Sequence, residues 1–330
     1  MGKLQLSLGI GDYYHVRPLF DGSVQVEGID LLHVATGTED IFWRFGKYRE
    51  WDVSEMSFAN YSAQRSRDDS VMVAIPVFPS RVFRHSAIYV RKSSGITKPK
   101  DLAGKKVGVP EWAQTAGVYV RGQLVHQEGL RLADVEWIQS GVNEPGREEK
   151  FTYQFPPGLR LTPRRERSLN DMLIDGQIDA IITARTPIGF DQGHPEVVRL
   201  WPDYDKVEEE YGLSTGIFPI MHLIAIRGEI YRQYPWVAMN LYKAFDVAKK
   251  LAVERLSQFT ISWLPMAWLP RAAERTARLF KGHEYWPYGI EPNRVTIEAF
   301  QQYLHEQAIT TRRLTPEDLF AKETQSFARV

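Results

Sequence analysis

The sequence predicts an α/β fold in which βα units form two lobes that face each other across a cleft. Short apolar runs bounded by glycine or proline alternate with helical patterns along the chain. Polar clusters follow several of these runs, as expected where strands end at a binding site. Two proline-marked apolar stretches, near residues 71–90 and 216–227, give the chain places to cross between lobes. We expect lobe one to comprise residues 1–90 and 220–330, lobe two residues 93–215, and the crossovers to lie near 87–92 and 216–222.

The composition excludes several classes of protein. The chain has 330 residues, enough for two domains of ordinary size, and its formal net charge is zero. No global field therefore attracts nucleic acid or an anionic membrane. The chain has no cysteine, which excludes disulfides, thiol nucleophiles and cysteine-ligated metals. The start, LQLSLGI, reads as a strand rather than a signal peptide, and no run reaches the roughly 20 apolar residues of a membrane span. We therefore expect a cytoplasmic protein.

The first 70 residues contain three predicted strands, at 4–9, 29–34 and 52–57, and two helices, at 38–48 and 58–67. Asp12 and His15 follow the first strand, where we expect a binding site; the alternative is a polar loop that begins with an aspartate turn. Glu55 lies at the junction between the third strand and the next helix. It is a second candidate, and the alternative is an ordinary pair near the surface.

The segment from residue 74 to 91, AIPVFPSRVFRHSAIYVR, is the richest in candidate residues. We predict a strand, a turn stiffened by two prolines, and a second strand. Arg81, Arg84 and His85 lie between the two apolar runs, together with Phe83. Guanidinium groups match carboxylates in shape and charge, so we expect this turn to hold a small, anionic, aromatic molecule. The alternative is a surface turn with solvated arginines and phenylalanines that belong to the core.

The middle of the chain continues the α/β pattern. A strand at 107–110 precedes a helix at 115–128, and Thr115 stands at the helix N-terminus, where backbone N–H groups favour an anion. Residues 143–163 are irregular and rich in proline and charge, which indicates a lid or an oligomer contact. An apolar strand at 178–183 is followed by Arg185. A buried cation there needs a partner, and a ligand carboxylate would supply one.

The last third of the chain is mostly helical. The apolar run GIFPIMHLIAIR contains His222; a lone histidine in such a run is more often a hydrogen-bonded core residue than a catalyst. Helices are expected at 229–258 and near 291–308, and a short one follows Thr315. The tryptophan-rich segment 261–280 is expected to belong to the core or to a subunit interface, and we expect a homo-oligomer. The sequence shows no internal repeat, P-loop, dinucleotide glycine motif, HExxH or nucleophile elbow.

Several segments together carry a family resemblance. DLAGKKVGV at 101–109 resembles the start of lobe two in type 2 periplasmic binding proteins, a fold of two mixed sheets flanked by helices with a cleft between the lobes. IPVFPSRVFRHSAIYVR, GVPEW, NEPGR, GIFPIMH and WPYGIEPNR resemble the 4,5-dihydroxyphthalate decarboxylase family, and the similarity runs from DYYHVRPL to LTPEDLF. The resemblance implies a carboxy-lyase of bacterial phthalate breakdown. It would convert 4,5-dihydroxyphthalate, an aromatic dicarboxylate, to protocatechuate and CO2.

The chemistry implied by the resemblance assigns roles to the candidate residues. Arg81, Arg84 and Arg185 would hold the carboxylates, and His85 or His222 would donate a proton to the ring. Asp12, His15 or Glu55 would act on the ring hydroxyls. The aromatic ring would pack on Phe83 and Trp112. We expect no cofactor and no metal ligands; the alternative is that three or more of His15, Glu55, His85 and His222 bind a divalent metal.

Two other functions remain open at this point. The same two-lobed fold serves solute-binding proteins, which would bind an aromatic carboxylate without turnover. Another cytoplasmic lyase on this scaffold, such as a relative of chorismate dehydratase or of pyrimidine-precursor synthases, is the third alternative. Release of CO2 from dihydroxyphthalate distinguishes the first function from the other two.

Overall fold

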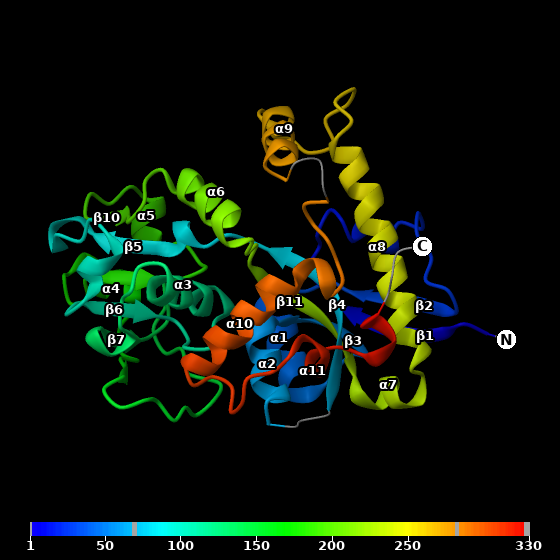
Figure 1. Cartoon of the computed structure of the whole chain (residues 1–330), viewed down its shortest axis with the longest axis horizontal. Coiled ribbons are helices and arrows are strands. Elements are labelled where there is room, and N and C mark those ends of the chain that lie inside the picture. Colours follow the sequence, from blue (N-terminus) through cyan, green and yellow to red (C-terminus); the bar gives the residue numbers. More distant parts are fainter. Residues whose placement is uncertain (1, 68–70, 281–283, 327–330) are drawn as a thin grey trace.

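The computed structural model describes residues 2–67, 71–280 and 284–326, which form two lobes side by side, each built on its own sheet (Figure 1). Lobe one contains a five-stranded sheet with the order β2-β1-β3-β11-β4. Its strands are β1 (Leu4–Gly9), β2 (Ile29–Val34), β3 (Val53–Ser57), β4 (Met72–Arg81) and β11 (Ile220–Arg227). β11 runs antiparallel to its neighbours β3 and β4, whereas β1, β2 and β3 are parallel. The sheet is therefore mixed, as predicted.

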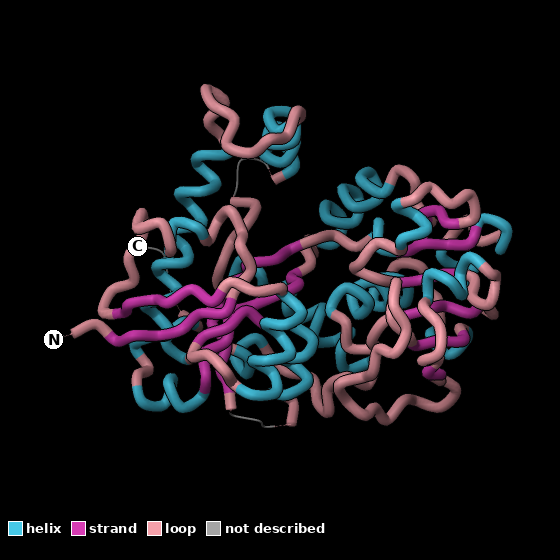
Figure 2. Tube along the Cα trace, turned by 180° about the vertical axis from the view of Figure 1, so that it is seen from behind, coloured by secondary structure: helices cyan, strands magenta, loops and turns pink. Residues whose placement is uncertain are grey.

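Lobe two contains a six-stranded mixed sheet with the order β10-β5-β9-β6-β7-β8. Its strands are β5 (Ile88–Arg91), β6 (Lys106–Val109), β7 (Glu136–Gln139), β8 (Leu161–Pro163), β9 (Ala180–Ile182) and β10 (Val197–Arg199). The two groups of strands are separate in the trace, and the chain passes between them twice (Figure 2). The expected lobe limits at residues 90, 93, 215 and 220 remain a proposal. Sheet membership places β5, which begins at Ile88, in lobe two.

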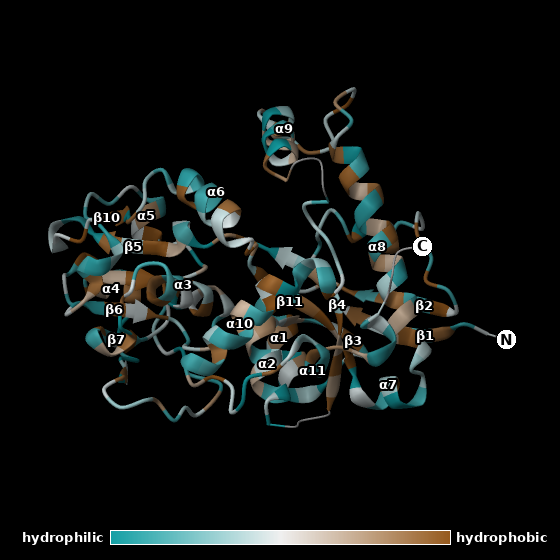
Figure 3. Cartoon of the chain, viewed as in Figure 1, coloured by the Kyte–Doolittle hydropathy of each residue, from teal (hydrophilic) through white to brown (hydrophobic). Residues whose placement is uncertain are grey.

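Apart from α9, the helices lie around the sheets and leave the apolar strands inside (Figure 3). They are α1 (Thr38–Tyr48), α2 (Phe58–Arg65), α3 (Thr115–His126), α4 (Leu169–Ile174), α5 (Ile188–Asp191), α6 (Tyr204–Thr215), α7 (Gly228–Gln233), α8 (Trp236–Leu256), α9 (Leu269–Leu279), α10 (Arg294–Glu306) and α11 (Pro316–Leu319). The single helix expected at 229–258 is two helices, because Pro235 ends the regular hydrogen bonding of α7 before α8 begins. In the part of the chain that the structure describes, no helix is both long and apolar enough to cross a bilayer.

The predicted proline turn near residue 76 is wrong. β4 continues through Pro76 and Pro79 to Arg81. Proline is tolerated there because β4 is an edge strand, whose outer side needs no ladder hydrogen bond. The prolines instead break the register with β11: β4 advances five residues, from Ile75 to Ser80, while β11 advances two, from Ile224 to His222. The result is a bulge opposite the start of β11.

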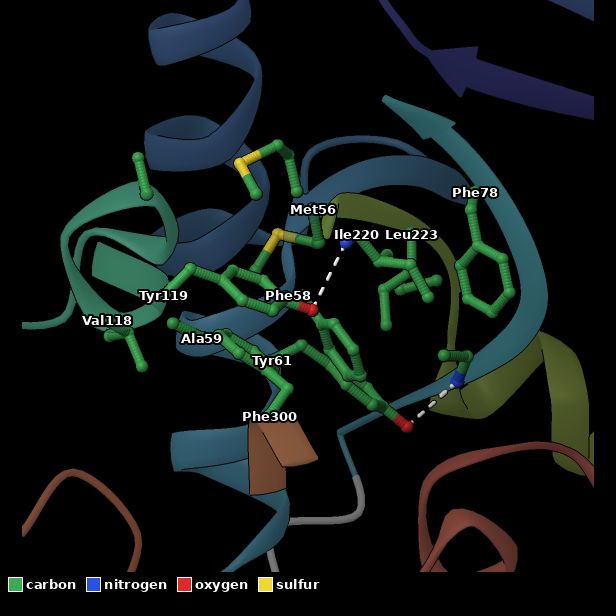
Figure 4. Close-up of a cluster of buried hydrophobic side chains, with 14 of the residues drawn as sticks. Met56, Phe58, Ala59, Tyr61, Phe78, Val118, Tyr119, Ile220, Leu223 and Phe300 are labelled. Carbon is green, nitrogen blue, oxygen red and sulfur yellow. Dashed lines mark hydrogen bonds between the residues drawn. The ribbon is translucent and has the colours of Figure 1, made fainter. Parts of the chain in front are cut away.

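The two lobes share one apolar core (Figure 4). Tyr119 in α3, on lobe two, stacks on Phe300 in α10 with ring centroids 4.3 Å apart. Its hydroxyl accepts a 3.1 Å hydrogen bond from the backbone N–H of Ile220, at the start of β11. Phe58, in lobe one, packs on the other side of the same cluster, 4.8 Å from the Phe300 ring. This packing fixes α3 against the first residues of β11 and α2.

The segment 261–280 projects from the end of α8 and is not part of the core (Figure 1). None of the residues of α9 is buried, and Trp268 is 76 % exposed. The core alternative for this segment is therefore wrong, and a role in a subunit interface remains a prediction. Arg275 in α9 reaches α6 in lobe two and pairs with Glu209 at 2.6 Å and with Asp205 at 3.0 Å.

Candidate functional site

The candidate site lies at one edge of the lobe-one sheet. The carboxyl ends of β1 and β3 meet there with the amino end of the antiparallel strand β11. His222 lies opposite Ser57 in the β3–β11 ladder, and Glu55 is two residues away on the same face of β3. Paired and diagonal residues of neighbouring strands are close enough for side-chain contact. The segment after β1 brings Tyr13 to the same place.

Glu55 and His222 form a hydrogen-bonded pair. Glu55 Oε1 lies 2.6 Å from His222 Nδ1 and accepts a second hydrogen bond of 2.5 Å from the Tyr13 hydroxyl. Glu55 Oε2 accepts from the backbone N–H of Gly11 at 2.9 Å. The carboxyl is 0 % exposed, and burial alone would raise its pKa. The imidazole and these hydrogen bonds outweigh burial and lower the pKa of Glu55, so that a carboxylate faces His222.

The partners of His222 determine which of its nitrogens can react. A carboxylate can only accept, so Nδ1 carries the proton that Glu55 binds. Among the described residues, Nε2 has no hydrogen-bond partner, and the side chain is 19 % exposed. The edge of the ring packs against Phe42 in α1, with centroids 4.7 Å apart. Nε2 is therefore the atom that can give a proton to a bound molecule or take one from it.

The bulge between β4 and β11 has a direct effect on this site. The register shifts on both sides of His222, between Ile220 and His222 and again between His222 and Ile224. A bulge turns a side chain away from the direction that a regular ladder would give it, and such bulges are common next to functional sites. The Pro-Val-Phe-Pro sequence of β4 is thus the part of the chain that sets the local backbone at His222.

A buried polar contact joins this edge to lobe two. The hydroxyls of Ser57, at the end of β3, and Thr115, at the start of α3, are 2.9 Å apart. Thr115 Oγ1 also accepts a 3.2 Å hydrogen bond from the N–H of Ala59 in α2. Gln114 accepts from the N–H of Ala184, after β9, at 3.2 Å. These contacts form a continuous path from the His222 strand pair to the loop that carries Arg185.

Arg185 itself pairs across the lobes. Its Nη2 lies 3.2 Å from Glu39 Oε1, in the first turn of α1, and the Arg185 side chain is 63 % exposed. Arg147, from the irregular segment after β7, contacts the other oxygen of Glu39 at 3.2 Å. Arg147 also donates to Glu111 at 2.7 Å. Two cations of lobe two therefore converge on one carboxylate of lobe one. The expectation of a buried Arg185 is wrong, because the side chain is mostly exposed and pairs with Glu39, and its contact with a ligand carboxylate remains a prediction.

The three residues from the crossover segment have different environments. Arg81 is buried and donates to the carbonyls of Phe218 and Pro287, with its guanidinium 4.4 Å above the Phe218 ring. This arginine holds backbone in place, and its contact with a substrate carboxylate remains a prediction. Phe83 stacks on the same Phe218 ring, with centroids 4.9 Å apart, and meets Tyr211 edge-on at 6.4 Å. Its role against a substrate ring remains a prediction.

Arg84, unlike Arg81, has no oxygen acceptor among the described residues. Its Nε lies 3.2 Å from the sulfur of Met221, the neighbour of His222, and no ion pair of Arg84 occurs within residues 2–67, 71–280 and 284–326. Burial lowers the pKa of Arg84 to about 10, although Glu208 acts in the opposite direction. Arg84 is still a cation at neutral pH. A partly buried cation with a thioether partner fits the predicted carboxylate contact.

The structure does not bring His85 into contact with His222. His85 is 1 % exposed and lies between Trp201 and Tyr211, with ring centroids 5.4 Å and 5.1 Å away. Neither of its nitrogens has a hydrogen-bond partner among the described residues, and Glu208 is 3.9 Å away. Burial lowers the pKa of His85 to about 4. A neutral, enclosed imidazole is poorly placed to donate a proton to a bound molecule.

Three further candidates lie around the site rather than in it. Asp12 is exposed and forms a two-pronged ion pair with Arg17 at 2.7 and 2.8 Å, so that a contact with ring hydroxyls, which remains a prediction, would compete with Arg17. His15 packs between the Tyr13 and Trp286 rings, with centroids 5.5 and 5.6 Å away, and burial lowers its pKa to about 4. Trp112 is fully buried beneath Arg121, whose guanidinium lies 3.8 Å from the ring, so it belongs to the core of lobe two.

The metal alternative required three or more of His15, Glu55, His85 and His222 to converge. Of these, Glu55 and His222 are in contact, whereas His85 contacts Trp201 and Tyr211. Within the described part of the chain there is no group of three or more histidine, aspartate or glutamate side chains placed to hold a metal ion. The residues that the structure describes do not fit a metal centre.

Sequence reasoning missed three residues of this arrangement as site residues: Tyr13, Glu39 and Ser57. The sequence marked Tyr13 only as one member of a polar cluster after β1. Hydrophobic periodicity and composition do not indicate which side chain of a loop points inward. Glu39 has the position of an ordinary acidic residue in a first helical turn. Ser57 has the pattern of a helix cap, and it does accept a hydrogen bond from the Asn60 N–H.

Two curated proteins are similar to this chain in sequence. The curated 4,5-dihydroxyphthalate decarboxylase of Comamonas testosteroni is 38 % identical over 321 residues, which cover 97 % of each chain. The protein of the same name from Pseudomonas putida is 42 % identical over 204 residues, or 62 % of this chain and 79 % of the relative. A family model described as NMT1/THI5 like matches residues 60–146.

Solved structures share the fold at low sequence identity. The periplasmic aliphatic sulphonate binding protein SsuA of Escherichia coli has a TM-score of 0.56 and 13 % identity, with 98 % of this chain and 99 % of that chain covered. The desulfurization enzyme DSZB has a TM-score of 0.53 and 14 % identity, with 98 % and 97 % covered. The periplasmic-binding-protein-like fold is thus used by a binding protein and by an enzyme. The sequence identity to the curated relatives establishes more than the fold: this chain belongs to the 4,5-dihydroxyphthalate decarboxylase family.

Proposed function

We propose that this protein is a carboxy-lyase that converts 4,5-dihydroxyphthalate to protocatechuate and CO2 in the breakdown of phthalate. The observation that carries the proposal is the pair formed by Glu55 and His222, which leaves Nε2 of a carboxylate-held imidazole open to a ligand. The names of the two curated relatives give the substrate. A buried carboxylate that fixes the imidazole tautomer and favours its protonated form is the arrangement that proton transfer requires.

The reaction replaces a carboxylate on the ring by a proton. Simple loss of CO2 would leave negative charge in the plane of the ring on the carbon that carried it. In the proposed course, the hydroxyl para to the leaving carboxylate pushes electrons into the ring, and His222 Nε2 delivers its proton to the ipso carbon. The ring-to-carboxylate bond then breaks, its electrons restore aromaticity, and CO2 leaves. Glu55 stabilises the imidazolium before the transfer and keeps Nδ1–H oriented after it.

The carboxylate that remains on the ring needs an anchor. Arg84, which has no oxygen acceptor among the described residues, is a cation next to the strand that carries His222, and we assign it to this carboxylate. From lobe two, Arg185 and Arg147 are candidates to bind the same substrate carboxylate. Both are placed to hold a carboxylate group, because they already pair with that of Glu39. The helix N-terminus at Thr115 lies between them and the His222 strand.

Several expectations from the sequence remain predictions. We expect turnover without a cofactor, which is tested by full activity after exhaustive treatment with chelator and verification of metal content. The alternative is activity that requires a divalent ion. A cytoplasmic location and a homo-oligomer are tested by cell fractionation and by light scattering on the purified chain. Assembly through the exposed segment around Trp268 would account for its exposed aromatic surface.

The experiment that tests the function is CO2 release from 4,5-dihydroxyphthalate by the purified chain. We expect turnover by the wild type and a loss of about a hundredfold or more in His222→Gln, because glutamine can still bind Glu55 but cannot donate a proton to carbon. His85→Phe is the matched control among the candidate imidazoles, and it should retain activity within a few fold. Tight binding of the dicarboxylate by the wild type without CO2 release would favour a solute-binding function instead. Loss of activity in His85→Phe alone would move the proton donor to His85.

A further inference from the structure

The Tyr13 hydroxyl makes two close approaches to the Glu55–His222 pair, and Ser80 in β4 also hydrogen-bonds to it. It donates a 2.5 Å hydrogen bond to Glu55 Oε1, the same oxygen that binds His222 Nδ1. It also lies 3.3 Å from His222 Nδ1 itself. One carboxylate oxygen therefore has two donors, a phenol and an imidazole, which share its charge.

We propose that Tyr13 is a positioning residue that controls, through Glu55, how strongly His222 holds its proton. The significance of this control for catalysis rests on the proposed function, but the hydrogen-bonded set is a property of the protein itself. Nothing in the reaction requires Tyr13 to touch the substrate. Its effect is transmitted by the oxygen that it shares with His222.

The physical argument follows from charge. A hydrogen bond from a phenol draws electron density from Glu55 Oε1 and weakens the attraction of that oxygen for an imidazolium. When the phenol is removed, more of the carboxylate charge acts on His222, and the protonated form of the ring is stabilised. The imidazole should then release its proton at higher pH. A merely structural role of the Tyr13 ring would not move this midpoint in a defined direction.

The surrounding groups do not supply an alternative partner for the pair. The titratable groups that contact it or act on it come from three segments: Tyr13 and His15 after β1, Glu55 in β3, and Tyr288 in the turn before α10. Burial lowers the pKa of His15 to about 4, so this ring is neutral at the pH of the reaction. Burial, with Glu55 next in importance, raises the pKa of Tyr13, so its hydroxyl stays protonated and remains a donor. α1 contributes the uncharged Phe42.

The chain offers a matched control in the next residue. The Tyr14 hydroxyl is buried and has no hydrogen-bond partner among the described residues. Tyr14→Phe therefore removes a phenolic oxygen from the same loop without removing an interaction with the pair. Tyr13→Phe removes the oxygen that binds Glu55 and leaves the ring that packs against His15.

The experiment measures the protonation of His222 directly, by long-range ¹H–¹⁵N spectra of protein labelled in histidine, with the His222 signals assigned from His222→Gln. We expect Tyr13→Phe to move the His222 midpoint up by about half a pH unit or more, and Tyr14→Phe to leave it in place. His222 acts as a proton donor, so its deprotonation produces the alkaline limb of the kcat/KM profile. That limb should move by the same amount. An unchanged midpoint in a folded Tyr13→Phe protein would overturn the proposal.

A second variant covers the case in which Tyr13→Phe does not fold. Incorporation of 3,5-difluorotyrosine at position 13 keeps the hydroxyl and makes it a stronger donor, so the His222 midpoint should move down. A shift upward or no shift would contradict the proposal. The spectra do not depend on turnover. Shifts in the expected directions without CO2 release would uphold this inference and overturn the proposed function.

Discussion

The hydroxyls of Ser57 and Thr115, 2.9 Å apart, join the end of β3 in lobe one to the start of α3 in lobe two. The contact is buried. Ser57 lies directly opposite His222 on the neighbouring strand, so the contact is next to the site. Thr115 was expected to bind an anion at its helix N-terminus. In this structure its hydroxyl is occupied by Ser57 and by the N–H of Ala59, so that an anion would have to compete with both.

The first prediction concerns this contact. Thr115→Val keeps the shape of the side chain but leaves the Ser57 hydroxyl and the Ala59 N–H without their partner. A buried donor without an acceptor costs about 1–3 kcal/mol, so we expect the free energy of unfolding to fall by about that amount. Urea denaturation measures it.

The control for this prediction is Thr310→Val. Thr310 is equally buried, but its hydroxyl has no partner in the part of the chain that the structure describes. Its replacement should leave stability unchanged or raise it, because no hydrogen bond is lost. Equal losses in the two variants would show that the Ser57–Thr115 contact contributes nothing specific.

The second prediction concerns Glu39, the carboxylate that Arg147 and Arg185 share across the lobes. If these arginines bind a substrate carboxylate, Glu39 competes with it. Glu39→Gln should then bind phthalate two- to fivefold more tightly, since exposed ion pairs contribute about 1 kcal/mol at most. Phthalate lacks the ring hydroxyls, so binding can be followed by calorimetry without turnover.

The control is Glu50→Gln. Glu50 is also exposed and paired with an arginine, but that residue is Arg44 in the same lobe. This change should not alter phthalate binding. Weaker binding in Glu39→Gln would assign the opposite role to Glu39, that of holding the lobes together around a ligand.

The sequence predicted the regular elements well where one physical signal dominates. The alternation and bounding residues of β1, β2 and α1 gave their limits as the structure has them. The prediction failed at β4 because proline reads as a turn unless the strand is known to lie at a sheet edge, which depends on the whole topology. The same limit hid the bulge at His222, since it results from the pairing of residues that are far apart in sequence.

The site was predicted residue by residue but not as an arrangement. Glu55 and His222 were both candidates, yet no spacing in the sequence shows that they are diagonal neighbours on adjacent strands. Arg81, Arg84 and His85 are close in sequence and end in three different environments. Arg81 donates to backbone carbonyls, Arg84 contacts a thioether sulfur, and His85 is enclosed by aromatic rings. In an irregular segment, tertiary packing decides where each side chain points. The local sequence pattern carries no information about that packing.

The third prediction is a pH effect on stability from His85. Burial lowers the pKa of His85 to about 4, below the value of an unfolded histidine near 6.5. As the pH falls below 6.5, the unfolded chain takes up a proton that the folded chain refuses, so stability is lost. Between pH 7 and pH 5 the wild type should lose about 2 kcal/mol more than His85→Phe.

Urea denaturation at the two pH values measures this difference. His305→Phe, on the exposed surface of α10, is the control and should behave as the wild type does. His15 has a pKa lowered in the same direction, so its contribution remains in both proteins and cancels from the comparison. A pH dependence that is the same in His85→Phe and in the wild type would contradict the enclosed, neutral state of this ring.

The fourth prediction has the opposite sign and concerns Glu149, which accepts hydrogen bonds from the backbone N–H of Trp112 and from the Tyr153 hydroxyl. Burial raises the pKa of Glu149 to about 7, and Glu111 acts in the same direction. Between pH 4.5 and 7 the unfolded chain has lost this proton and the folded chain still holds it. The contribution of Glu149 to the free energy of unfolding is therefore fully present below about pH 4.5. It is lost progressively as the pH rises from there through 7.

Glu149→Gln keeps one oxygen for the backbone N–H of Trp112, its amide NH2 can donate to the Tyr153 hydroxyl oxygen, and the variant removes the titration. The variant should match the wild type near pH 4.5 and be more stable by about 2–3 kcal/mol at pH 8, because the buried charge is absent. Glu148→Gln changes the preceding glutamate, which is exposed and paired with the exposed Arg165, and should have no such effect. The measurement is the urea denaturation midpoint of the wild type, Glu149→Gln and Glu148→Gln, followed from pH 4.5 to 8. Parallel curves for all three would mean that Glu149 is ionised in the folded protein throughout, with its charge held by Trp112 N–H and Tyr153 alone.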